Sequence, residues 1–79
     1  MGALSVASPV ATITLDETQY RQALRRVRSE FLEMPGMILT AHQVQRLAGV
    51  DAYLCACVLE ELVLSGLLCR GASGTYKRS

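Results

Sequence analysis

Apolar side chains recur every three or four residues between positions 20 and 34, and this spacing predicts an amphipathic helix. Its start is expected near Thr14 or Asp16, because hydroxyl and acidic side chains cap the exposed N–H groups at a helix start. Pro35 and Gly36 should end the helix, since proline cannot continue one. The stripe expected to face the core consists of Tyr20, Leu24, Val27, Phe31 and Met34.

Two further helices follow, and each has its own start and stop signals. Thr40 and Gln43 have the spacing of a capping box, and Gly49 suits the left-handed conformation that ends a helix. Asp51 caps the next helix, which we expect to run from about residue 52 to residue 65. The side chains expected to be buried are Val44, Leu47 and Ala48 in the first of these helices, and Cys55, Val58, Leu59 and Leu62 in the second.

Short apolar segments at 37–39, 67–70 and 75–78 predict small strands, and the last two flank a Gly-Ala-Ser-Gly loop that favours a tight turn. Residues 1–13 are small and weakly apolar, so we expect a flexible N-terminal tail ahead of a single domain at residues 14–79. The predicted order is therefore helix, strand, helix, turn, helix and a β-hairpin.

This order resembles the winged-helix family, in which a helix-turn-helix is followed by a β-hairpin called the wing. The resemblance covers roughly residues 16–78 and depends on residues in and after the turn. They are Val44, Leu47, Ala48, Gly49 and Val50 around the turn, then Cys55, Val58, Leu59 and Leu62, and finally Ser65, Gly66, Leu67 and Leu68 at the exit into the wing. The resemblance implies a mainly α fold with a small β component, built as three helices plus a short antiparallel β-hairpin wing.

The resemblance also implies a role for the last helix, because in this family the second helix of the motif lies in the DNA major groove. Reading base edges requires donors and acceptors such as those of Arg, Asn or Gln. The equivalent positions here carry a phenol, small apolar groups and an acid, and phosphates would repel Glu60 and Glu61. These positions are Ala52, Tyr53, Leu54, Ala56, Cys57 and Glu60. Their chemistry argues against ordinary sequence-specific DNA binding.

Composition and charge favour an apolar surface that contacts a protein over a strongly basic surface that binds nucleic acid. Eight basic and seven acidic residues give a net charge of +1, whereas a nucleic-acid-binding chain usually has a clearer basic excess. A chain of 79 residues that is 51% hydrophobic has more apolar side chains than its small core can bury. The three cysteines have apolar neighbours, and no apolar run reaches the ~18 residues of a membrane span. We therefore expect reduced thiols in a soluble, cytoplasmic protein.

The basic residues have two interpretations. Arg21, Arg25 and Arg28 form a stripe beside the apolar face of the first helix. This stripe is either a solvated face, partly paired with nearby glutamates, or a contact for phosphates or an acidic partner. Lys77 and Arg78 in the wing are candidates for phosphate contacts, because some winged helices touch DNA with the wing.

The sequence gives little support for catalysis or metal binding. Cys55 and Cys57 are two residues apart on a helix, so their side chains diverge by about 200° and cannot easily hold one ion. Cys69 and His42 do not complete a paired Cys-x-x-Cys pattern. We find no Ser-His-Asp set, phosphate-binding glycine loop or paired carboxylates in the sequence. We therefore expect no enzymatic activity, no metal, no cofactor and no small-molecule substrate.

Two hypotheses of function follow. The first is a DNA-binding, transcription-regulatory type of protein that binds mainly through wing and backbone contacts, with Lys77, Arg78, Arg21, Arg25, Arg28 and Tyr53. The second is a protein-interaction or homodimerisation module that presents Tyr53, Leu54, Ala56 and Cys57 to a partner. The precedent of the family favours the first and residue chemistry favours the second, and we rank DNA binding slightly ahead.

Overall fold

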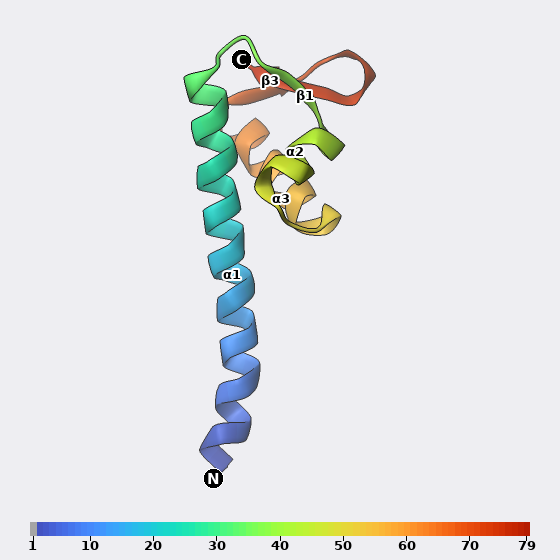
Figure 1. Ribbon diagram of the computed structural model, residues 1–79. Coiled ribbons are helices and arrows are strands. Elements are labelled where there is room, and N and C mark those ends of the chain that lie inside the picture. Colours follow the sequence, from blue (N-terminus) through green and yellow to red (C-terminus); the bar gives the residue numbers. More distant parts are fainter. Residues whose placement is uncertain (1) are drawn as a thin grey trace.

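The computed structural model describes the backbone of residues 2–79 and the side chains of residues 17–79. Its elements, in chain order, are α1 (Gly2–Glu33), β1 (Ile38–Thr40), α2 (Ala41–Ala48), α3 (Ala52–Leu64), β2 (Leu68–Arg70), the 3-10 turn η1 (Ala72–Gly74) and β3 (Thr75–Arg78). Helices α2 and α3 pack against the C-terminal half of α1, and the sheet lies across the end of this helical group (Figure 1). The predicted fold class is confirmed, because three helices and a small antiparallel sheet combine in a layout like that of a winged helix.

Helix α1 has a different start from the predicted one. It begins at Gly2 instead of near Thr14 or Asp16, and it ends at Glu33, just before Pro35. The predicted start near residues 14 and 16 is therefore wrong, because both positions lie inside α1. The flexible tail predicted at residues 1–13 falls outside the residues whose side chains the structure describes, and it stays a prediction.

The buried stripe of α1 is mostly the predicted one. Val27 and Phe31 are fully buried, and Tyr20 and Leu24 are half-buried against the core. Met34 was expected to be buried, and this is wrong: it lies beyond the last residue of α1 and is 57% exposed. Ala23, which the sequence pattern did not single out, is buried in the same stripe.

Side-chain caps fix the bounds of α2 and α3, as predicted. Thr40 Oγ1 accepts from the Gln43 N–H at 3.2 Å, and Gln43 Oε1 accepts from the Thr40 N–H at 2.9 Å. Gly49 ends α2 with a left-handed φ of 70°. Asp51 Oδ1 then accepts from the Leu54 N–H at 2.7 Å and starts α3. The turn between the two helices is therefore held by local hydrogen bonds.

The sheet has the strand order β1-β3-β2, and both pairings are antiparallel. The sequence predicted β1 as a strand but did not predict that it pairs with β3. Tyr76 lies opposite both Leu39 and Arg70, so these three side chains share one face of the sheet. Because Leu39 and Tyr76 pack against the core, this face is turned toward the helices.

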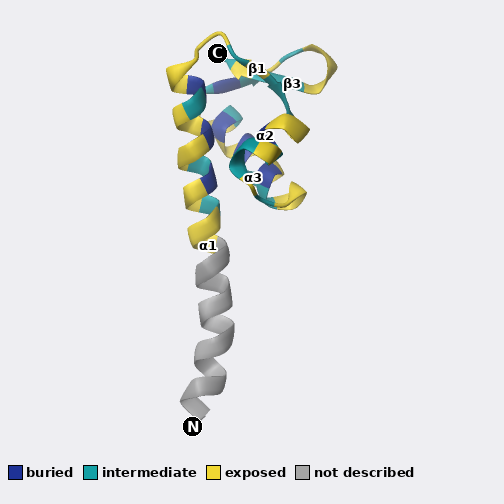
Figure 2. Cartoon of the chain, in the orientation of Figure 1, coloured by how far each residue is buried: buried dark blue, intermediate teal, exposed yellow. Residues whose placement is uncertain are grey.

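The core lies between α1, α3 and the sheet, where Figure 2 shows the buried residues on the facing sides of the helices. Burial of each large apolar side chain stabilises the fold by about 1.5–3 kcal/mol. Leu47 and Ala48 are half-buried instead of fully buried as predicted. The buried residues are Ala23, Val27, Phe31, Val44, Cys55, Val58, Leu59, Leu62 and Leu68.

Candidate functional site

The surface of α3 that points away from the core carries the two most exposed of the large apolar side chains among the described residues. Four α3 residues, Cys55, Val58, Leu59 and Leu62, face the core, so helical periodicity turns the opposite side to solvent. We define the outer face of α3 as Tyr53, Ala56, Cys57, Glu60 and Leu64. Its two large apolar side chains, Tyr53 and Leu64, are 79% and 75% exposed.

The predicted partner-binding residues are only partly on this surface. Tyr53 and Ala56 are exposed and Cys57 is half-buried, whereas Leu54 is half-buried beside the outer face. Leu64 was missed. It comes about three helical turns after Tyr53, which places both on the same side of the helix. Helical spacing measured from Tyr53 was therefore the signal that could have found Leu64.

The acid on the outer face of α3 is held by an arginine from the sheet. Arg70 on β2 donates from Nη2 to Glu60 Oε1 at 2.9 Å. The Arg70 guanidinium also lies 6.0 Å from the centre of the Tyr76 ring, within cation–π range. Both partners of the ion pair are more than half exposed, so it contributes little to stability. The ion pair instead changes the charge of the surface, because Arg70 neutralises Glu60, and it links α3 to the sheet.

A shallow hollow lies between α2, α3 and the sheet, next to this ion pair. Its volume is about 290 Å³, and its lining includes the small side chains of Ala41, Ala52 and Ala56. His42 and Gln45 of α2 also border it. The sequence did not single out Arg70, because its proximity to Glu60 depends on how the sheet packs onto α3.

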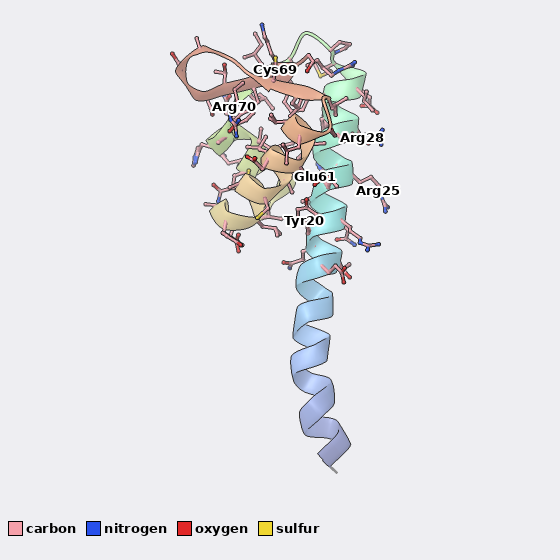
Figure 3. All side chains as sticks on the ribbon, turned by 180° about the vertical axis from the view of Figure 1, so that it is seen from behind. Tyr20, Arg25, Arg28, Glu61, Cys69 and Arg70 are labelled. Atoms are coloured by element: carbon pink, nitrogen blue, oxygen red, sulfur yellow. The ribbon has the colours of Figure 1, made fainter. Side chains whose placement is uncertain are left out.

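A second hollow, which we call the α1–α3 groove, lies on the other side of α3. Its volume is about 460 Å³, and its apolar lining comes from Leu24, Leu62 and Leu67. Arg28 of α1 and Glu61 of α3 also line it, so it has a cationic side and an anionic side. Figure 3 shows Glu61 between the two helices and Arg25 and Arg28 on α1.

Tyr20 lies at the same helix pair, and its environment is apolar and acidic. Burial is the main cause of its raised pKa, and the nearby Glu61 and Cys57 raise the pKa further. The phenol therefore stays neutral at physiological pH. It supplies an uncharged hydroxyl beside the groove, not an anion.

The basic residues predicted to bind phosphate are distributed over two elements. Arg21, Arg25 and Arg28 are exposed on α1, and Arg21 forms an ion pair with Glu17 at 3.5 Å. Lys77 and Arg78 are neighbours on β3, so their side chains point to opposite faces of the sheet. Lys77 is exposed, whereas Arg78 Nε is buried without a hydrogen-bond partner. The structure therefore does not bring the two wing residues onto one surface.

Among residues 17–79, no group of three or more His, Cys, Asp or Glu side chains could hold a metal ion. Cys55, Cys57 and Cys69 are free thiols; Cys55 is buried, as predicted, and Cys57 and Cys69 are half-buried. In the part of the chain that the structure describes, every helix is too short or too polar to cross a membrane.

No protein-family model, no curated protein and no solved structure matches this chain.

Proposed function

We propose that this chain is a winged-helix protein-interaction module whose contact surface is the outer face of α3. The observation that carries the proposal is the exposure of Tyr53 and Leu64, at 79% and 75%, on the same side of one helix. Tyrosine is enriched at the energetic centres of protein interfaces, because a rigid ring buries a large area at a low cost in conformational entropy. The proposed activity is binding, not catalysis.

The electrostatics of the same surface support a protein partner over DNA. A base-reading helix needs side-chain donors and acceptors, but α3 has the apolar Ala52, Ala56 and Leu64 on or beside its exposed side. Its exposed acids are Glu60 and Glu61, and Arg70 is already bound to Glu60. A surface that is apolar and nearly neutral suits the core of a protein interface.

A photo-cross-linker placed at position 53 tests the proposal. We expect p-benzoylphenylalanine at this position to form a protease-sensitive adduct in cells that make the protein. The matched control is the same group at Gln22, which is also exposed but lies on α1, away from the outer face of α3. A second substitution, Leu64→Ser, should reduce the adduct at position 53 several-fold. The absence of any adduct at position 53 would refute the proposed function.

DNA binding is the second candidate, and the exposed row of Arg21, Arg25 and Arg28 on α1 supports it together with Lys77. Contacts with phosphates would make the affinity fall steeply with salt, and each contact that is removed should reduce the slope of log Kd against log salt by about one. Titration of mixed duplex DNA at low and moderate salt measures this slope for the wild type and for Arg25→Gln, Lys77→Ala and Arg78→Ala. If no binding is measured even at low salt, this candidate is eliminated.

The cytoplasmic location expected from the sequence is part of the same proposal. Three free cysteines suit a reducing compartment, where thiols stay unpaired.

A further inference from the structure

We propose that the partner is a second copy of this chain, and that the surface formed by the α1–α3 groove and the adjoining outer face of α3 in one copy packs against the same surface of the other copy. The inference rests on the proposed function, because it uses the same exposed side of α3 and adds the identity of the partner. It commits to a symmetric dimer in which α1 and α3 of both copies pack as a four-helix group.

Apolar surface is present on both parts of this contact. The groove has Leu24, Leu62 and Leu67 in its lining, and the outer face of α3 presents Tyr53 and Leu64. Burying such side chains against one another provides the main driving force for association. Because Tyr53 and Leu64 are largely exposed, a partner can bury more of their apolar surface than it could of a half-buried side chain, and the gain in free energy is larger.

Charge complementarity favours a second copy as the occupant. Among residues 17–79, the ion pairs are Arg21 with Glu17 and Arg70 with Glu60, so Arg28 and Glu61 have no ion-pair partner within the described chain. The two residues nevertheless line the same groove from opposite helices. In a two-fold dimer, Glu61 of each copy can meet Arg28 of the other, and this contact occurs twice.

Other binding partners fit a groove that contains both Arg28 and Glu61 less well. Duplex DNA would be attracted by Arg28 but repelled by Glu61 in the same groove. An unrelated protein would need matching charges of both signs, whereas this chain has both of them on the same surface. Self-complementarity is therefore the simplest explanation of the pattern.

The test uses the purified full chain and two charge-reversal variants, Arg28→Glu and Glu61→Arg. Sedimentation equilibrium of the wild type should show a dimer. Each variant alone places like charges opposite each other at both symmetric contacts, and we expect its dimer Kd to rise by about tenfold or more. An equimolar mixture of the two variants restores opposite charges at both contacts, so it should form a heterodimer with a Kd within about threefold of the wild type.

Only a contact between copies can produce this recovery on mixing, because charge repulsion within one chain is unchanged by the second variant. The matched control is Arg26→Glu, which makes the same charge change two residues away, on another side of α1. This control should dimerise like the wild type. Far-UV circular dichroism of each variant checks that the helices are retained.

Two outcomes would overturn the inference: a wild type that sediments as a monomer at high concentration, or a mixture of variants that stays as weakly associated as each variant alone. Neither outcome decides the proposed function. A monomeric wild type with an adduct at position 53 that joins a protein of another mass would refute the second copy and leave the interaction surface in place. If position 53 forms no adduct, the proposed function itself fails.

Discussion

Cys55 shows how the environment of one side chain changes its chemistry. Its thiol is buried between α2 and α3, and Sγ donates to the Ala41 carbonyl at 3.6 Å. Burial raises the pKa of the Cys55 thiol above its usual value of 9.0, because the thiolate would lose its hydration. The neutral, protonated form is therefore part of the folded state.

This raised pKa predicts that Cys55 stabilises the protein less at high pH. Above the usual value of 9.0, the unfolded chain releases the Cys55 proton while the folded chain keeps it, so unfolding becomes more favourable. The slope approaches about 1.4 kcal/mol per pH unit between the unfolded and folded pKa values. Urea unfolding at pH 7.5, 9 and 10 should show that the stability difference between wild type and Cys55→Ala shrinks as pH rises. A difference that is constant over this range would contradict the prediction.

At the scale of elements, the turn from α2 to α3 sets the direction of the helix that carries the proposed contact surface. Gly49 has φ of 70°, a conformation that L side chains rarely adopt, and Asp51 begins α3 directly after it. The end of one helix and the start of the next are therefore fixed within a few residues. Any residue with a Cβ at position 49 introduces backbone strain even though the space around it is open.

We expect Gly49→Ala to lower the free energy of unfolding by about 1 kcal/mol, because alanine in the left-handed region is strained. The control is Gly36→Ala, at a glycine that also has open space around it but no positive φ. This control should be neutral or slightly stabilising, since it restricts the unfolded chain without straining the folded one. Chemical denaturation of both variants measures the difference. Equal effects of the two substitutions would show that the conformation at Gly49 is not the cause.

For the whole molecule, a small core must hold three helices and a sheet together. Phe31 is fully buried at the C-terminal end of α1, in one cluster with Leu59 and Leu68. A domain of this size has a free energy of unfolding on the order of 4–12 kcal/mol, so one large core side chain is a substantial part of it.

Phe31→Ala should therefore lower the free energy of unfolding by about 3–5 kcal/mol, through lost burial and the cavity that remains. Leu32→Ala is the matched control, because Leu32 is adjacent in sequence but 44% exposed. Its effect should be well below that of Phe31→Ala. Thermal or urea unfolding followed by circular dichroism compares the two. Similar losses would contradict the assignment of Phe31 to the core and Leu32 to the surface.

The elements of the fold, and part of the candidate site, could be predicted from local sequence. The capping box of Thr40 and Gln43, the left-handed Gly49 and the cap at Asp51 each depend on residues within a few positions, so the sequence determines them without tertiary contacts. The burial of Cys55 and the exposure of Tyr53 follow in the same way from helical periodicity.

Features that depend on distant residues were decided only by the tertiary structure. Met34 has the spacing of a core residue, but α1 ends before it, and Ala23 is buried because of how closely α1 packs on its neighbours. The pairing of β1 with β3, the ion pair between Glu60 and Arg70, and the meeting of Arg28 and Glu61 at one groove each join separate elements. Periodicity within a helix or strand determines which side of that element is apolar, but only packing determines which sides face each other, since that depends on the complementary shapes of all the elements together.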